Sequence, residues 1–343
     1  MDYNFLNKLL ATDSPSGFEI KAQKLIKDYM GNYCDEFLTN HSGNLISVLN
    51  NNSKNKILLA AHIDEIGLMV TDIMPNGIIK VTNVGGIKAN LYVGQRIKVL
   101  TLDGKTIYGV CDVARSSLES KISAEDLFIN IGVDFKEEAL KLVKPGDYVL
   151  LDASYRYIND ERLVSKALDD KIGVFVILEA LKKAKELKTS NTVYALTSVG
   201  EETTMRGASF AGFMVKPKLA IVVDVTFVTN TPEDVGCGDV SLGLGPVLCH
   251  STIVNRKINQ VLEDVAKENN INIQYEIAVG RTGTDADRIY FTKDGIPTAL
   301  VSIPLKNMHS ISEMCDLKDV EAAIELIAKF ILKLDDIDLD PFR

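Results

Sequence analysis

The sequence of 343 residues lacks several features that would point to a particular class of protein. It has no apolar stretch near the ~20 residues that a membrane-spanning helix needs, and no run rich in Lys or Arg. Its formal charge of -9 also disfavours nucleic acid and acidic membranes, because such surfaces repel a net anionic protein. We therefore expect neither nucleic acid nor a membrane as a partner.

Paired cysteines and an export signal are missing as well. The five cysteines are an odd number, widely scattered and without a C-x-x-C pair, which is typical of reduced thiols inside the cell. Cys249 stands beside His250, but adjacent side chains rarely face each other, so we favour a structural role for this thiol. The first ten residues contain Asp2 and Lys8 and have no basic n-region or small-residue cleavage site. These features predict a cytoplasmic protein.

The chain has ample apolar material for a large core, at 46% of its residues, and this material falls into two patterns. Helical spacing and short, fully apolar runs occupy both ends of the chain, whereas residues from about 68 to 157 form short β-rich runs between turn signals. We predict helices over 6–10, 20–31, 171–187, 258–265 and 317–332, and strands over 56–61, 78–81, 96–100, 148–151, 192–199, 219–225 and 296–303. Ser16 and Glu19 form a capping-box pattern before the second helix.

Helices that alternate with fully apolar strands predict an α/β fold with both faces of the sheet covered. The apolar strand near the start completes the sheet that the C-terminal part of the chain begins. We therefore expect one discontinuous α/β domain, residues 1–66 and 162–343, split by an inserted β-rich domain, residues 67–161.

Residues that can bind metals gather where the predicted strands end, which is where open α/β sheets build their sites. Each lies just after a predicted strand, inside the end of one, or at the start of a helix. They are His62 and Asp64, Asp169 and Asp170, Glu201 and Glu202, Asp224, and His309.

Imidazole and carboxylate ligands without thiolate suit Zn, Co or Mn, and one carboxylate can bridge two ions about 3.5–4 Å apart. Such a site polarises a scissile carbonyl and activates water, but it still needs a base for the proton of that water. Glu201, next to the ligand Glu202, suits this role. Asp64 lies two residues beyond His62 on an extended chain and therefore on the same side, where it can orient the ligand imidazole.

Each of these residues also has an ordinary structural explanation. A single His after a strand is more often a hydrogen-bonded structural residue, and Glu-Glu or Asp-Asp pairs are usually solvated surface charges. Asp224 differs, because an unpaired carboxylate in a buried strand costs several kcal/mol unless a partner compensates it. The metal hypothesis depends on the whole set rather than on one residue.

Several segments, taken in order, resemble the blocks of the tetrahedral (TET) aminopeptidases, metallopeptidase family forty-two, which includes glutamyl aminopeptidases. They are AHIDEIGLMV, SKALDDKIG, TSVGEET, VVDV, GTDAD and IPTALVSIPLKNMHSISEM, and the resemblance covers essentially the whole chain. It implies the di-metal aminopeptidase fold, a mixed sheet flanked by helices, with an inserted PDZ-like β domain. It also implies two divalent ions per subunit, short peptide substrates and a homo-oligomer that is commonly a tetrahedral dodecamer.

The resemblance assigns a role to each residue. His62 and Asp224 would hold one ion, Glu202 and His309 the other, with Asp169 as the bridge. Glu201 would be the general base, and Asp64 would support the first His. Asp169 is chosen over Asp170 by analogy with related peptidases, in which the bridge stands first.

The sequence departs from the family pattern in two places. The Arg-Tyr pair often found before the last His is replaced by Leu305 to Met308, and a Pro-Pro-His segment by Ala114 to Leu118. The substrate pocket, and the loops that line its entrance or the assembly, are therefore expected to differ from the pattern. Arg281 is a further candidate, because its planar fork could pair with an acidic side chain of the substrate; the alternative is a surface arginine.

Two other kinds of function remain open from the sequence. A related di-metal carboxypeptidase or N-acyl amino acid deacylase would use similar chemistry, but the β insertion and the HSISEM block fit the aminopeptidases better. A non-catalytic assembly protein would keep the fold without the chemistry, and loss of Glu201 or of a ligand would have indicated it. A glycosidase needs two free carboxylates, whereas these look committed to metal.

Overall fold

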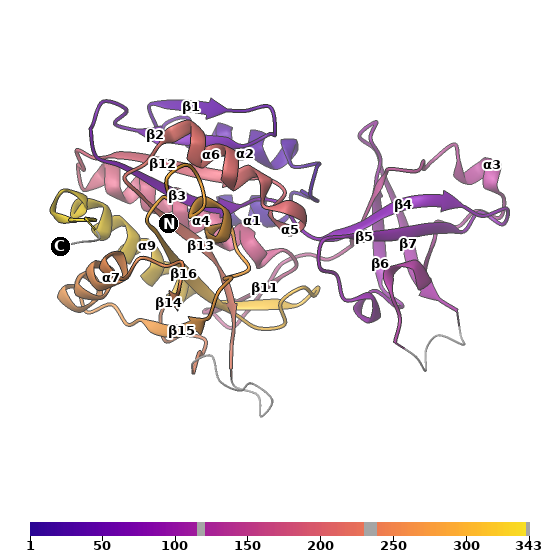
Figure 1. Ribbon diagram of the computed structural model, residues 1–343. Helices are drawn as coiled ribbons and strands as arrows, with labels where there is room; N and C mark the ends of the chain where they lie inside the picture. The colour runs from indigo at the N-terminus through magenta and orange to yellow at the C-terminus, as the bar shows by residue number, and fades with distance from the viewer. Residues whose placement is uncertain (115–120, 230–238, 341–343) are drawn as a thin grey trace.

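The computed structural model describes residues 1–114, 121–229 and 239–340. Within them, the short apolar runs become strands of one eight-stranded sheet (Figure 1). The four central strands, β12, β3, β13 and β16, are parallel. The sheet is mixed, because β2 on one side and β14 on the other pair antiparallel with this group, whereas β14 and β15 are parallel to each other. In sheet order the strands are β1 (Glu36–Thr39), β2 (Leu45–Leu49), β12 (Thr192–Ser198), β3 (Lys56–His62), β13 (Leu219–Phe227), β16 (Thr298–Leu305), β14 (Val247–Ser251) and β15 (Gln274–Ala278).

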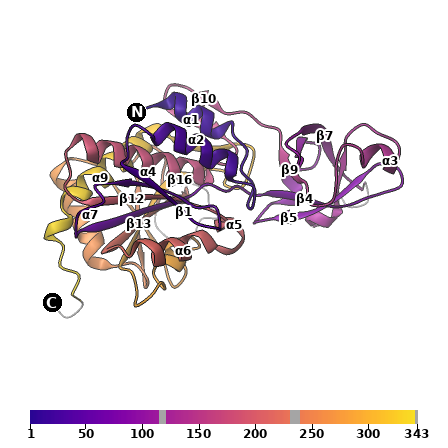
Figure 2. The ribbon, with the colours of Figure 1, turned by 90° about the horizontal axis from the view of Figure 1, so that it is seen from above.

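Helices cover both faces of this sheet because successive strand side chains alternate between its faces. Leu59 and Ile221 face the larger core with α1, α2, α4, α7 and α9, whereas Leu58 and Val222 face the smaller core with α6 and α8. Figure 2 shows α1 and α2 across the sheet from α6. The helices are α1 (Tyr3–Leu10), α2 (Ile20–Met30), α4 (Leu168–Glu186), α5 (Glu201–Thr204), α6 (Arg206–Val215), α7 (Arg256–Glu268), α8 (Ala286–Ile289) and α9 (Leu317–Leu332), followed by the 3-10 turn η4 (Leu334–Asp336).

None of the described helices is both long enough and apolar enough to span a bilayer.

The predicted helices and strands are confirmed, with shifts of a few residues at their ends; α9, β6 and β9 match their predicted ranges. The predicted capping box is wrong. Helix α2 begins at Ile20 without a side-chain cap, and the Ser16 hydroxyl donates instead to the Asp64 carboxylate at 2.5 Å. The buried Asp64 carboxylate therefore accepts the hydrogen bond of the Ser16 hydroxyl, which the capping-box pattern assigned to the N-terminus of α2.

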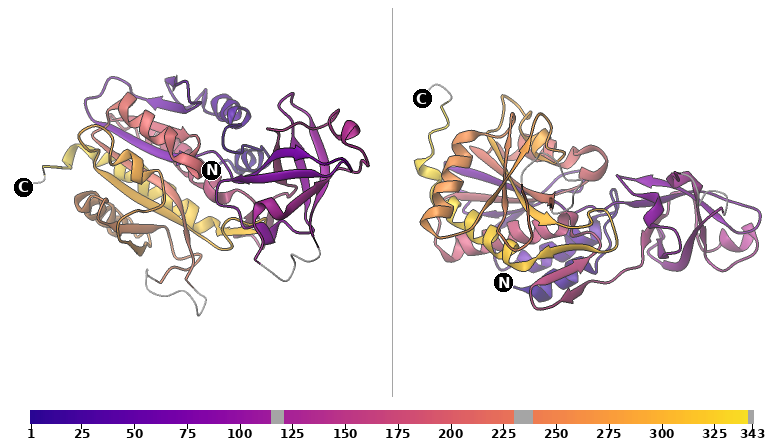
Figure 3. Two further views of the ribbon diagram at one scale, coloured as in Figure 1. Left: turned by 45° about the vertical axis from the view of Figure 1, so that its right-hand side comes forward. Right: turned by 90° about the horizontal axis from the view of Figure 1, so that it is seen from below.

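The β-rich segment forms a closed barrel beside the α/β part, and closure leaves it without exposed sheet edges (Figure 3). Its strands are β4 (Gly67–Ile73), β5 (Ile79–Val84), β8 (Leu127–Asn130), β7 (Thr106–Val113), β6 (Arg96–Leu100) and β9 (Tyr148–Leu151), with the short helical elements η1 (Ala89–Leu91), η3 (Ala124–Asp126) and α3 (Lys136–Ala139). All of these elements lie within the expected insertion. The finer PDZ-like description stays a prediction.

The barrel is held against the α/β part next to the ends of the central strands. A small sheet of β10 (Arg156–Ile158), β11 (Arg162–Ser165) and β17 (Glu313–Asp316) returns the chain from the barrel. Lys98 of the barrel forms a 2.7 Å ion pair with Asp13, and the Tyr148 hydroxyl donates to the Ser16 carbonyl at 3.1 Å. The barrel therefore borders the region where the polar residues gather.

Candidate metal centre

The register of the parallel strands brings polar side chains to one level of the sheet. Ser198 of β12 pairs with His62 at the end of β3, and Val222 of β13 pairs with Ala60. Two residues further along each strand, Asp224 therefore lies level with His62. The chain then turns from β12 into α5, which places Glu201 and Glu202 above the same strand ends.

Asp169 lies between the two histidines. One carboxylate oxygen, Oδ1, is 3.1 Å from Nε2 of His62, and the other, Oδ2, is 3.1 Å from Nε2 of His309. The same His62 nitrogen is 3.9 Å from a Glu201 oxygen, and the His309 nitrogen is 3.8 Å from a Glu202 oxygen. The site thus has two halves, each with one imidazole and one oxygen of Asp169.

Asp224 and Asp170 lie on the His62 side. His62, Asp170 and Asp224 offer ligand atoms within 4.8 Å of one another, and so do His62, Asp169 and Glu202. The fully buried Asp170 carboxylate accepts hydrogen bonds from the backbone N–H groups of His62 at 3.3 Å and Gly173 at 3.0 Å. Of the two neighbouring aspartates, it is Asp169 whose carboxylate stands between the imidazoles.

Both imidazoles are oriented by main-chain carbonyls. Nδ1 of His62 lies 3.0 Å from the Asp64 carbonyl oxygen, and Nδ1 of His309 lies 2.9 Å from that of Gly86. A proton on each Nδ1 leaves the Nε2 lone pair of each ring directed at the centre, as a metal ligand requires. Gly86 allows this close approach, since a Cβ there would lie 3.3 Å from the His309 ring.

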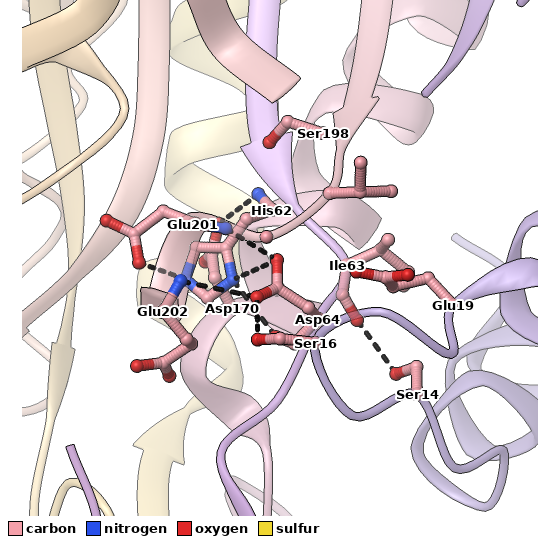
Figure 4. A network of polar contacts seen from close by, with 12 residues as sticks. Ser14, Ser16, Glu19, His62, Ile63, Asp64, Asp170, Ser198, Glu201 and Glu202 are labelled. Atoms are coloured by element: carbon pink, nitrogen blue, oxygen red, sulfur yellow. Dashed lines mark hydrogen bonds and ion pairs between the residues drawn. The ribbon is translucent and has the colours of Figure 1, made fainter. Parts of the chain in front are cut away.

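The predicted role of the Asp64 side chain needs correction. Its carboxylate is 3.7 Å from the His62 ring nitrogen, and the carbonyl of the same residue makes the hydrogen bond to that ring. The carboxylate instead accepts from the backbone N–H groups of Glu201 at 3.0 Å and Glu202 at 3.2 Å, and from Ser16 (Figure 4). Asp64 therefore holds the turn that carries both glutamates, because unpaired N–H donors at the start of α5 need an acceptor.

Glu313 is a site residue that the sequence reasoning missed. Its buried carboxylate accepts hydrogen bonds from the backbone N–H groups of His309 at 2.8 Å and Asp169 at 3.2 Å. It thus fixes the bridge and the second imidazole together. Its position four residues after His309, inside the HSISEM block, was the only available signal.

The centre holds more buried negative charge than its own side chains can balance. Burial, with the nearby Asp169 carboxylate, raises the pKa of Asp224 to about 8, and burial with neighbouring carboxylates raises that of Glu201 to about 9. Burial works to lower the pKa of His62, but its hydrogen bond to Asp169 and the surrounding carboxylates raise it well above its ordinary value.

These side chains line one cavity of about 320 Å³, and no Lys or Arg is among the described residues that line it. Cations placed between the carboxylates would remove the imbalance, so this donor set fits divalent metal ions.

The Glu201 carboxylate has one buried oxygen without a partner among the described residues. Its Oε1 is buried and has no hydrogen bond within the described part of the chain. The carboxylate lines the cavity, and its backbone N–H is held by Asp64. This leaves one fixed oxygen available to a water molecule or a substrate.

The remaining candidates lie outside this centre or contribute to its walls. Burial raises the pKa of Cys249 to about 12, which supports a structural thiol. Arg281 is exposed and does not line the cavity, whereas Met308 does. Of the stretch Ala114 to Leu118, residues 115–118 lie outside the described residues.

Known proteins are similar to this chain in sequence and in fold. The family model described as M42 glutamyl aminopeptidase matches residues 43–326. The lysyl aminopeptidase of Pyrococcus furiosus is 31% identical over 350 residues, covering 99% of this chain and 100% of the relative. The TET aminopeptidase of a marine sediment archaeon of the Thaumarchaeota superposes with a TM-score of 0.91 and 30% identity, over 98% of this chain and 96% of that one. The TET1 peptidase of Pyrococcus horikoshii, which can assemble into a tetrahedron or a large octahedral shell, gives 0.85 and 32%, over 95% and 98%.

Proposed function

The chain belongs to the M42 glutamyl aminopeptidase family and is an aminopeptidase, and we propose that it releases N-terminal residues from short peptides with two divalent metal ions. The observation that carries this proposal is the placement of Asp169, whose two oxygens each face one imidazole at 3.1 Å. No observation favours the carboxypeptidase, deacylase or non-catalytic alternatives.

We propose that His62 and Asp224 hold one ion and that Glu202 and His309 hold the other, with Asp169 shared between them. Imidazole and carboxylate donors suit Zn or Co, and also Mn. When bound, the ions polarise the scissile carbonyl and lower the pKa of the attacking water.

Glu201 acts as the general base. It takes a proton from the attacking water and passes it to the leaving amine. One carboxylate can reach both, because the attacking oxygen and the leaving nitrogen are bonded to the same carbon. Its buried and unpartnered Oε1 supports this role, because an oxygen already engaged in hydrogen bonds would be less available. Asp64 keeps Glu201 in place through the backbone N–H of that residue, and so acts as a positioning residue.

A refilling experiment tests this proposal. The protein is stripped with a chelator, refilled with Zn, Co or Mn, and assayed on aminoacyl-chromophore substrates. We expect activity to disappear and return, and Glu201→Gln to lower kcat by about 10²–10⁴-fold with normal metal content. Glu268→Gln, on the exposed side of α7, is the matched control.

Activity that survives complete metal removal would refute the metal-dependent mechanism. Loss of metal from Glu201→Gln would instead make Glu201 a ligand rather than the base.

We also propose that the chain forms a homo-oligomer, with the tetrahedral dodecamer as the specific hypothesis. Large apolar side chains stand exposed at several places, among them Phe213 on α6, at 57%, and Val279 just after the edge strand β15, at 86%. Burying such side chains between subunits is favourable. The TET1 relative supports a closed assembly. Light scattering of the purified protein measures its mass; a monomer would refute the proposal.

Three further statements remain proposals of the same kind. The chain divides at residues 66 and 162 around the barrel domain, the barrel is PDZ-like, and the protein works in the cytoplasm. Limited proteolysis tests the first, because a separate barrel should be released or removed by cleavage near those residues.

A further inference from the structure

The cavity that contains the candidate metal ligands is also lined by a carboxylate that has no part in the proposed mechanism. This is Glu276 on β15, at the far edge of the sheet from β1. Two hydroxyl groups hold it in place. Its Oε1 accepts from Ser302 at 3.0 Å, and its Oε2 accepts from Thr226.

The hydroxyls that hold Glu276 lie beside the ligand Asp224. Thr226 follows Asp224 by two residues on β13, so the two side chains point to the same face about 6.6 Å apart. Ser302 on β16 pairs with Asp224 in the strand register. The Glu276 carboxylate is therefore about one side-chain length from the metal centre.

Glu276 has acceptor capacity to spare. An ionised carboxylate has about four lone-pair sites, and the two hydroxyl donors occupy two of them. Within the described residues, no cation contributes to the electrostatics of this group: burial raises the pKa of Glu276, and only the Thr226 and Ser302 hydroxyls oppose the effect. A cation from outside the chain would satisfy the remaining sites.

Apolar side chains also line the cavity that Glu276 shares with the candidate ligands. They include Val225, Ala278, Leu300 and Met308. The lysine side chain combines a flexible four-carbon stem with a terminal ammonium group, and such stems pack along apolar surface while the charge reaches a polar partner. A four-carbon stem spans about 6 Å, which matches the separation between Asp224 and Thr226 along β13.

We propose that Glu276 determines specificity and that the cavity selects peptides whose first residue is lysine or arginine. This inference rests on the proposed function, because it requires the scissile carbonyl to lie at the Asp169 centre. An acidic first residue would bring a second carboxylate against Glu276, and Arg281 lies outside the cavity and offers no counter-charge there. A leucyl side chain would contact the apolar residues that line the cavity but would leave Glu276 without a cationic partner.

The test compares kcat/KM of the metal-loaded enzyme for lysyl, arginyl, leucyl and glutamyl chromophore substrates. We expect the two basic substrates to be at least about tenfold better than leucyl and about a hundredfold better than glutamyl. Glu276→Gln should lower kcat/KM for the basic substrates by about 30-fold or more and leave the leucyl value within about twofold. Glu276→Asp keeps the charge, so its kcat/KM for the basic substrates should lie between those of the parent enzyme and Glu276→Gln. Glu268→Gln should match the parent enzyme.

Circular dichroism and metal content establish that each variant is folded and loaded. A parent enzyme that prefers leucyl or glutamyl substrates overturns the inference and leaves the proposed function intact. An equal loss on all substrates in Glu276→Gln assigns Glu276 a structural role and also overturns it.

If no substrate is cleaved, the proposed function fails, and calorimetry with free lysine and leucine decides the inference separately. Tighter binding of lysine to the parent, absent in Glu276→Gln, supports it, and equal binding overturns it.

Discussion

A buried charge cluster behind the metal centre provides a sharp test of the energetics. Glu65 is 3% exposed and accepts hydrogen bonds from Lys171 Nζ at 2.8 Å and from Lys166 Nζ. Lys171 is fully buried and also donates to the Thr12 carbonyl at 2.7 Å. Glu65→Gln keeps the shape of the side chain but removes its charge, so two buried ammonium groups lose their shared partner.

The expected loss in the free energy of unfolding of Glu65→Gln follows from the burial of these charges and not from the number of ion pairs. Breaking a buried pair by removing one partner costs about 3–5 kcal/mol, because the remaining charge stays in a poorly solvated site. The exposed pair of Glu161 and Lys318 has a similar separation of 2.6 Å, but both side chains are more than half exposed. Glu161→Gln should therefore lower the free energy of unfolding far less than Glu65→Gln does.

Urea unfolding at fixed protein concentration and metal load measures both variants. In Glu65→Gln, Lys166 keeps its ion pair with Asp13 at 3.2 Å. A third variant, Glu65→Gln combined with Lys171→Met, removes the other buried ammonium group and should recover part of the loss. A free-energy change for Glu65→Gln within about 1 kcal/mol of that for Glu161→Gln would refute the reasoning.

The same cluster predicts a pH dependence. Burial works to raise the pKa of Glu65, but Lys166 and Lys171 hold it well below its usual range. A carboxylate whose pKa is lower in the folded state stabilises the protein fully above its unfolded value, about 4.3, and this contribution is lost as the pH falls below that value. The deficit of Glu65→Gln should therefore be largest at neutral pH and should shrink in acid.

Three shorter predictions concern the centre itself. Asp169→Asn should lower the metal content from the proposed two ions per chain to less than one, since both halves share this residue; plasma emission spectroscopy measures it, and unchanged content would contradict the bridge. Asp64→Asn should lower kcat by about 10–100-fold with little change in KM, because the amide keeps only one of the two oxygens that accept from the Glu201 and Glu202 N–H groups; a change in KM alone would indicate another role. Arg281→Ala should leave the ratio of glutamyl to leucyl kcat/KM within about twofold, and a selective loss on Glu- or Asp-initiated peptides would restore Arg281 as a specificity residue.

The sequence reasoning located most of the centre because the relevant signals are local. An aspartate within the apolar run of β13 stands out by its cost of burial, and His62 and Glu202 follow apolar strands directly. The same local patterns predicted the central strands and α9. These signals depend on side-chain alternation and on residue type within a few positions.

Residues whose role depends on distant partners were harder to predict. Asp64 was expected to face His62, two residues away, but its carboxylate bonds Ser16 and the turn of α5. The capping-box pattern at Ser16 failed for the same reason. In both cases a hydrogen-bond partner from another segment replaced the local partner that the pattern predicted.

The sequence by itself determined the alternation of helices and strands, the β-rich middle segment, and the residue types that could bind metal. Only the tertiary structure decided that Asp169 stands between two imidazoles, that Glu313 fixes both halves, and that Glu276 shares the cavity. The physical reason is range. Periodicity reports contacts within a few residues, whereas the order and register of the strands bring together residues more than two hundred positions apart, such as Gly86 and His309.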